Sequence, residues 1–159
     1  MGHPPRIPVW LPWEQDVIYF VTICVSARRP VLANAASFAA FKTVAGGIRN
    51  WRVAAAVVMP DHAHFLVAPR ERDLTVGDFS NAVKRLWRRK LTTRQGASGM
   101  SRWEWQPGCF DRLLRSDESA SRKWEYIREN PVRAGLVACW EQWPFSIGFR
   151  GDPSAVAAS

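Results

Sequence analysis

The sequence predicts an α+β sandwich of the ferredoxin-like (RRM-like) type, in which an antiparallel sheet carries its helices on one face. Two observations lead to this prediction. Segments rich in β-branched and aromatic residues alternate with segments of helical periodicity, in the order strand, helix, strand, strand, helix, strand. In addition, 159 residues, 47% of them hydrophobic, are enough for one domain with its own core.

The N-terminal half supplies the first strand and the first helix. Residues 17–26 are rich in Val, Ile, Tyr, Phe and Thr, and they predict a strand that is buried on at least one face. Asn34 or Ser37 can cap a helix that runs to about Asn50, because their side chains can accept hydrogen bonds from the free N–H groups of a first turn. A second strand over residues 53–59 follows.

A bend then leads to the rest of the sandwich. Pro60 and Asp61 interrupt the apolar run and separate the second strand from a third, over residues 62–68. A long helix over residues 75–95 and a strand over residues 110–115 complete the pattern.

One more helix follows the last strand. It begins near Asp117, and we expect it to stop at Asn130 because the ring of Pro131 disfavours helical backbone in the residue before it. The chain therefore divides into an extended, proline-rich arm (1–16), a single domain (17–146) and a flexible C-terminal tail (147–159).

Two histidines stand in the middle of an apolar segment. In a strand, side chains two residues apart point to the same face, so His62 and His64 aim together while Ala63 points to the core. Neutral imidazole is the commonest metal ligand in proteins, and a strand holds both rings rigidly. The pair therefore predicts half of a metal site. The alternative is a polar pair on a solvated strand face.

The charge of the chain is strongly positive. Lys and Arg number 22 against 14 Asp and Glu, a net charge of +8, which favours a polyanionic partner such as nucleic acid. Much of this charge falls on the helix over residues 75–95, which has no acidic residue from position 84 to 94. This helix predicts a phosphate-facing surface, although a solvated helix face is the alternative. Its basic residues are Lys84, Arg85, Arg88, Arg89, Lys90 and Arg94.

The sequence gives no sign of a membrane protein. No apolar run approaches the roughly 20 residues that a spanning helix needs, and the first residues lack a signal-peptide pattern. We therefore expect a cytoplasmic protein.

The last helix carries a polar stripe beside its apolar one. Ser119, Lys123, Tyr126 and Asn130 share that stripe, with Tyr126 and Asn130 four residues apart. A phenol facing a phosphodiester near the histidines could attack phosphorus, helped by the field of a divalent ion or by the Lys123 cation. Asn130 could provide a third metal ligand. The chain has no glycine-rich nucleotide loop, so no nucleotide cofactor is expected. The alternative is an amphipathic helix with a surface tyrosine.

Four sequence blocks resemble the single-tyrosine HUH (IS200-like) transposases, and most closely their REP-associated tyrosine transposase branch. They are the runs Tyr-Phe-Val-Thr from Tyr19, Val-Val-Met-Pro-Asp-His-Ala-His from Val57, Trp-Gln-Pro-Gly-Cys-Phe-Asp from Trp105, and Tyr-Ile-Arg-Glu-Asn-Pro-Val-Arg-Ala-Gly-Leu-Val from Tyr126. The second and fourth blocks, in this order, form a specific pair. The likeness extends over nearly the whole chain.

This resemblance implies an HUH endonuclease that cuts and rejoins single-stranded DNA beside a hairpin. The implied reaction uses one Mg²⁺ or Mn²⁺ ion and forms a covalent 5′-phosphotyrosine with a free 3′-hydroxyl. Carried over by position, His62 and His64 are metal ligands, Tyr126 is the nucleophile and Asn130 is a third ligand. The expected partner is single-stranded or hairpin DNA of a bacterial genome, which implies a nucleoid-associated protein.

Two positions depart from the family pattern. Ala63 replaces the common Val between the histidines, and Arg128 stands where relatives often carry His. A different class of function remains open, a catalytically silent module that binds hairpin DNA or RNA on the same fold. Both a monomer and a homodimer are compatible with the sequence.

Overall fold

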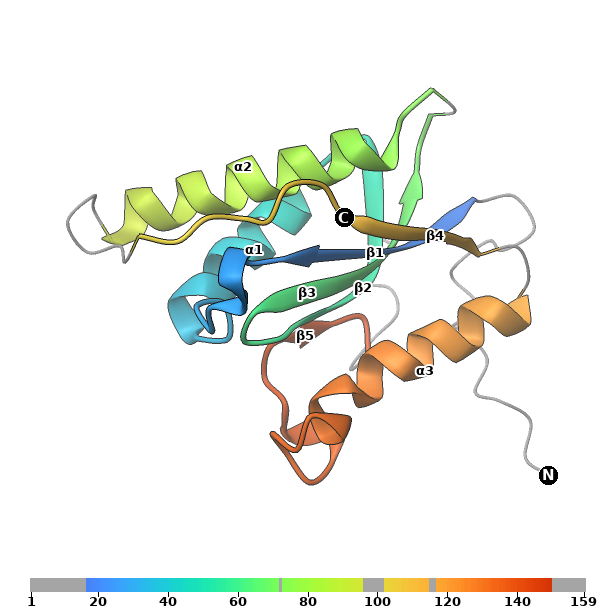
Figure 1. Cartoon of the computed structure of the whole chain (residues 1–159). Helices are drawn as coiled ribbons and strands as arrows, with labels where there is room; N and C mark the ends of the chain where they lie inside the picture. Colours follow the sequence, from blue (N-terminus) through green and yellow to red (C-terminus); the bar gives the residue numbers. More distant parts are fainter. Residues whose placement is uncertain (1–16, 72, 96–101, 115–116, 150–159) are drawn as a thin grey trace.

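The computed structural model describes residues 17–71, 73–95, 102–114 and 117–149 (Figure 1). The predicted N-terminal arm and residues 150–159 of the predicted tail lie outside this part of the chain. Within it, five strands form one antiparallel sheet in the order β4-β1-β3-β2-β5. The strands are β1 (Ile18–Cys24), β2 (Trp51–Val58), β3 (His62–Pro69), β4 (Phe110–Leu114) and β5 (Ser146–Ile147).

The first four strands have the spatial order of a ferredoxin-like sandwich, which confirms the predicted fold class. β5 was not predicted. It extends the β2 edge by pairing Ile147 with Ala56 and Ser146 with Val57. Two residues are too few to show the alternating pattern by which a strand is recognised in a sequence.

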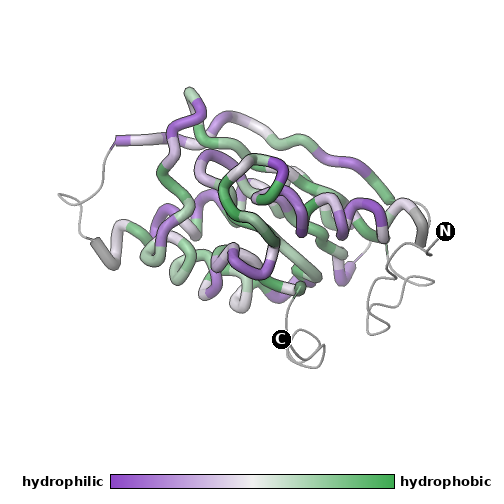
Figure 2. The backbone as a smooth tube through the Cα atoms, turned by 90° about the horizontal axis from the view of Figure 1, so that it is seen from below, coloured by the Kyte–Doolittle hydropathy of each residue, from purple (hydrophilic) through white to green (hydrophobic). Residues whose placement is uncertain are grey.

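The helices lie on both faces of the sheet, and here the prediction that they share one face was wrong. α1 (Ala35–Gly47) and α2 (Val76–Gln95) cover one face, and α3 (Asp117–Arg133) covers the other (Figure 1). The reason is that β1 and β3 are apolar on both sides. Val21 and Phe65 belong to the core under α1 and α2, whereas Ile18 and Leu66 belong to a second core with Ala120 and Ile127 of α3. Figure 2 shows hydrophilic and hydrophobic stretches alternating along the helical segments.

The helix boundaries follow local chemistry, with one exception. The Asn34 side chain accepts a hydrogen bond from the Ser37 N–H at 2.9 Å and caps α1, as predicted. α1 ends at Gly47, three residues earlier than expected. A short 3₁₀ turn also follows β1 (Ser26–Arg28), and another precedes β5 (Trp140–Gln142).

The exception is the end of α3, which continues to Arg133 although Pro131 lies within it. The Leu136 N–H donates to the Pro131 carbonyl at 2.9 Å, and the Gly135 N–H donates to Val132 at 2.9 Å. Gly135 has a φ of +74°, so this is a Schellman cap that satisfies the last carbonyls of the helix. The predicted stop at Asn130 was therefore wrong, because the cap and the buried Pro131 ring outweigh one missing N–H.

Two of the basic residues of α2 turn inward and hold the segment before β4. The Lys84 ammonium is buried and donates to the carbonyls of Gln106, at 2.8 Å, and Gly108. Burial lowers its pKa. The Arg88 guanidinium lies 4.6 Å from the ring centroid of Trp103 and donates to the Trp103 carbonyl. The structure does not favour Lys84 as a contact for nucleic-acid phosphates, because its donors are already used inside the fold.

Replacing Gly148 with alanine should destabilise the β2 edge. Gly148 has a φ of +87°, and a Cβ there would lie 2.3 Å from the Ala54 carbonyl oxygen. We expect a loss of at least about 2 kcal/mol in the free energy of unfolding, since left-handed backbone alone costs a side-chain-bearing residue about 1–2 kcal/mol. Urea denaturation measures it. Gly46→Ala is the control, because a Cβ there meets nothing within 4 Å, and it should be neutral or slightly stabilising. Equal effects of the two substitutions would contradict the close packing at Gly148.

Replacing Lys84 with methionine should also destabilise the protein. The change leaves the two carbonyls without their shared donor, and a lost hydrogen bond to a charged group costs about 1.5–3 kcal/mol. Arg85→Met, at the exposed neighbouring position, should stay within about 0.5 kcal/mol of the parent chain. Thermal unfolding of both variants checks this. A stable Lys84→Met variant would show that the ammonium does not anchor the segment.

Candidate active site

The candidate site lies where β1 and β3 pair, on the face of the sheet that α3 covers (Figure 1). In the antiparallel register Thr22 is opposite His64 and Cys24 is opposite His62. Since directly paired residues point to the same face of a sheet, these side chains share one surface. Ala63 is buried in the core on the other face. The two imidazole ring centroids are 4.7 Å apart, so the strand period aims both histidines as expected.

His64 is the buried member of the pair. Its Nδ1 lies 2.7 Å from the Thr22 hydroxyl oxygen, and its ring stacks on Phe20 with centroids 5.2 Å apart. Burial, assisted by the charges of His62 and Lys123, lowers the pKa of His64 to about 3. The ring is therefore neutral near pH 7. When Nδ1 donates to the Thr22 hydroxyl, Nε2 keeps its lone pair.

His62 is oriented by its neighbour in sequence. Its Nδ1 lies 2.6 Å from Oδ1 of Asp61. Burial acts to raise the pKa of Asp61, but the hydrogen bonds and charges of His62 and Arg28 outweigh it, so the pKa is lowered and the carboxylate is ionised. A carboxylate only accepts hydrogen bonds, so Nδ1 of His62 carries the proton and Nε2 keeps its lone pair. The carboxylate–imidazole pair is the arrangement that commonly supports a metal-binding histidine.

Arg28 contacts both Asp61 and Cys24 beside the histidine pair. Its Nε donates to Oδ2 of Asp61 at 2.8 Å, and its Nη1 lies 3.0 Å from the Cys24 sulfur. Arg28 and the preceding Ala27 have φ values of +54° and +56°. Left-handed backbone is costly for residues with a Cβ and tends to be retained at functional sites. The strained turn after β1 brings the guanidinium back over Asp61.

Tyr126 projects from α3 toward the same surface. Its ring centroid is 6.1 Å from that of His64 and 6.3 Å from that of Phe20. The residue is 41% exposed, so its phenol is accessible from solvent. The Lys123 ammonium lies 5.0 Å from the Tyr126 ring centroid, one turn earlier on α3. The structure thus brings Tyr126 and Lys123 to the histidine pair from a different element of the fold.

The donor set can bind a divalent cation only together with a ligand other than His, Cys, Asp or Glu. In the described part of the chain no group of three or more His, Cys, Asp and Glu side chains could hold a metal ion. The Nε2 atoms of His62 and His64 could provide two ligands, and any further protein ligand would have to be of another type. Asn130 lies one turn after Tyr126 on α3 and is half-buried, and its amide oxygen is of the type that hard divalent ions accept.

The outward-facing basic residues of α2 are remote from this site. Arg85, Arg89 and Lys90 are exposed, but α2 covers the opposite face of the sheet. The side chain of Arg94 lies outside the described residues. Sequence reasoning could place these cations on one helix, but it could not place that helix relative to the histidines.

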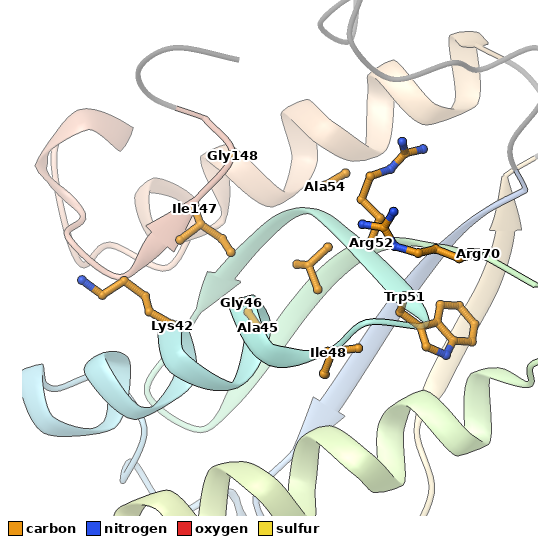
Figure 3. Close-up of a pocket in the computed structure, with 11 residues that line it drawn as sticks. Lys42, Ala45, Gly46, Ile48, Trp51, Arg52, Ala54, Arg70, Ile147 and Gly148 are labelled. Atoms are coloured by element: carbon orange, nitrogen blue, oxygen red, sulfur yellow. The ribbon is translucent and has the colours of Figure 1, made fainter. Parts of the chain in front are cut away.

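A separate hollow of about 230 Å³ lies at the β2 edge (Figure 3). α1, β2 and the end of the described chain form it, and its lining includes Lys42, Trp51, Arg52, Arg70 and Ile147. His62, His64 and Tyr126 are not among its lining residues.

Three supporting residues were not identified from the sequence. Thr22 and Arg28 come from β1 and the turn after it, and their roles depend on the register with β3. Arg133 has its guanidinium 4.2 Å from the Tyr126 ring centroid. The expected stop at Asn130 had removed Arg133 from the helix. The position of Asp61 next to His62 indicated from the sequence that Asp61 could belong to the site. Adjacency alone could not distinguish a metal ligand from a carboxylate that orients a histidine.

Comparison with known proteins gives relatives of one kind. No family model matches the chain. A REP-associated tyrosine transposase of Escherichia coli K12 is 32% identical over 98 residues, which cover 62% of this chain and 54% of the relative. A putative REP-associated tyrosine transposase of Haemophilus influenzae is 29% identical over 104 residues, which cover 62% and 58%. The chain thus matches little more than half the length of these curated relatives.

Solved structures agree in fold. A REP-associated tyrosine transposase bound to a REP hairpin superposes with a TM-score of 0.62 at 21% identity, covering 96% of this chain and 91% of the other. A putative transposase from Deinococcus radiodurans R1 gives a TM-score of 0.52 at 20% identity, covering 82% and 97%. These likenesses confirm the resemblance expected from the motifs. In sequence over most of its length, and in fold, the chain resembles the REP-associated tyrosine transposases.

Proposed function

We propose that this protein cleaves and rejoins single-stranded DNA beside a hairpin, with Tyr126 as the nucleophile. The observation that carries the proposal is the position of an accessible phenol 6.1 Å, ring to ring, from a buried neutral histidine of the His62–His64 pair. The names of the relatives support a transposase, and one solved relative is bound to a REP hairpin. Binding such DNA would place the protein at the bacterial nucleoid.

The chemistry follows from the side chains at this surface. The Tyr126 oxygen attacks the phosphorus and forms a phosphotyrosine, while the bond to the 3′ oxygen breaks and that oxygen takes up a proton. The phenol loses its proton in the same step, and the nearby Lys123 cation stabilises the negative charge that develops. Because the phosphotyrosine conserves the energy of the phosphodiester, a 3′-hydroxyl can reverse the step and rejoin DNA without ATP.

His62 and His64, through their Nε2 atoms, and Asn130, through its amide oxygen, would hold one Mg²⁺ or Mn²⁺ ion. When bound, such an ion polarises a phosphoryl oxygen and helps to orient the scissile bond. Thr22 and Asp61 hold the imidazole rings from their Nδ1 atoms, so that both Nε2 atoms stay available.

The exposed cations of α2 would serve a different part of the DNA. Arg85, Arg89 and Lys90 belong to α2, which covers the face of the sheet opposite to α3, so they would contact DNA away from the scissile phosphate. A folded hairpin is large enough to reach both faces around a sheet edge. We assign these residues to non-specific contacts with the phosphate backbone.

Trapping a covalent complex tests the proposed function. Labelled hairpin oligonucleotides with single-stranded flanks, incubated with the protein and Mn²⁺, should give a protein–DNA adduct on a denaturing gel. Tyr126→Phe should abolish the adduct. Tyr19→Phe is the matched control, because Tyr19 is the only other tyrosine of the chain and packs in the core under α1 and α2. DNA that shifts on a native gel without any adduct from several hairpins would instead indicate a silent binding module.

Asp61→Asn should weaken metal binding. The neutral amide is a poorer partner for the His62 Nδ1–H and loses the ion pair with Arg28, so the ring is less well oriented. Loss of such a supporting group typically costs about 10–100-fold in metal affinity. Electron paramagnetic resonance of free Mn²⁺ in a titration measures the change. Asp73→Asn, at an exposed position in the segment before α2, should leave the affinity unchanged. Equal affinities of the two variants would contradict a supporting role for Asp61.

A further inference from the structure

For attack on phosphorus, the ring of an exposed tyrosine must be held in one orientation. Tyr126 is 41% exposed, and its neighbours on the sheet side, His64 and Phe20, contact it by ring edges with centroids more than 6 Å away. These edge contacts hold the ring from the sheet side, and the Lys123 ammonium lies 5.0 Å from its centroid. An in-line attack requires reacting atoms to be held within a few tenths of an ångström, and a misplacement of about 1 Å can cost 100-fold in rate.

Arg133 adds a closer restraint. Its guanidinium carbon lies 4.2 Å from the Tyr126 ring centroid, the shortest of the cation–ring distances in the described part of the chain. The same guanidinium donates through Nη2 to the backbone carbonyl of Tyr126. One planar group therefore contacts both the ring and the main chain of the same residue, which an ammonium could not do with equal geometry.

The unexpected end of α3 makes this contact possible. Arg133 is seven residues after Tyr126, two helical turns on, and so lies on the same side of the helix. It has that position only because α3 continues through Pro131 and is closed by the Schellman cap at Gly135. A helix that stopped at Asn130 would leave Arg133 in a loop with no defined direction.

We propose that Arg133 is a positioning residue, which holds the Tyr126 phenol in the orientation needed for attack. The proposal rests on the proposed function of Tyr126. Arg133 also adds positive charge to the surface, where its field reaches His64 together with those of Lys123 and Arg28. A phosphodiester that approaches Tyr126 thus meets Lys123 before it on the helix and Arg133 after it.

Fluorine NMR can observe the restraint without DNA or metal. The chain contains only two tyrosines, so 3-fluorotyrosine labelling gives one signal from Tyr126 and one from Tyr19, the internal reference. Arg133→Gln should shift the Tyr126 signal and leave that of Tyr19 in place. Arg128→Gln is the matched control, because Arg128 on the same helix lies over Trp124 and Trp140 instead. It should move neither signal.

The kinetic counterpart separates positioning from DNA binding. Arg133→Gln should lower the rate of adduct formation at saturating hairpin DNA by at least about tenfold, with the Kd for DNA changed less than about threefold. Arg133→Lys should restore only part of the rate, since it keeps the charge and loses the planar fork. Arg128→Gln should leave the rate unchanged.

Two results would overturn the inference. One is a Tyr126 signal that does not shift in the Arg133→Gln variant, which would mean that the contact between Arg133 and Tyr126 does not exist in solution. The other is a loss that appears entirely in the Kd, which would make Arg133 an ordinary DNA contact. If the parent chain forms no adduct with any hairpin, the proposed function fails, and Arg133 then has no attack to position even if the fluorine shift is seen.

Discussion

The side chains of β3 alternate between two apolar cores, one on each face of the sheet, and this alternation fixes where the candidate site lies. Ala63, Phe65 and Val67 enter the core under α1 and α2, while His64 and Leu66 face α3. If β3 slipped by one residue in its register with β1, both histidines would point into the core under α1 and α2. The apolar residues of β3 that now fill this core would point to the opposite face. The native register is strongly favoured, because the slipped register would bury two polar imidazoles without hydrogen-bond partners, at a high cost in free energy. The apolar residues on both faces of β3 therefore fix the position of the site.

A sheet that is apolar on both faces needs two covering layers, and the second layer is what creates a site. α3 closes the face that carries the histidines and brings Tyr126 to them from more than 60 residues further along the chain. Both imidazoles on that face have a hydrogen-bond partner, Thr22 for His64 and Asp61 for His62. The result is a pair of histidines held on strands and an exposed tyrosine on a helix, as the proposed attack of Tyr126 on DNA would need.

Much of the fold could be predicted because its signals are local. The β-branched runs, the Asn34 cap and the helical stripe of α2 act within a few residues, and the strand period placed His62 and His64 on one face. Three features depend on distant parts of the chain. The opposite placement of α3 depends on apolar residues of β1 and β3 that pair only in the folded sheet. The inward turn of Lys84 depends on carbonyls more than 20 residues away. The extension of α3 past Pro131 depends on a cap closed by Gly135 and Leu136. Those same features decide which cations face the site.

The proposed function requires the β3 face under α3 to bind a divalent cation. The most direct test is X-ray diffraction from crystals soaked in Mn²⁺, with anomalous data collected at the manganese edge. We expect one strong anomalous peak within coordination distance of Nε2 of both His62 and His64, on the side from which Tyr126 approaches. The proposed metal site would be contradicted by a structure in which manganese binds elsewhere and these two atoms stay without a metal at saturating Mn²⁺.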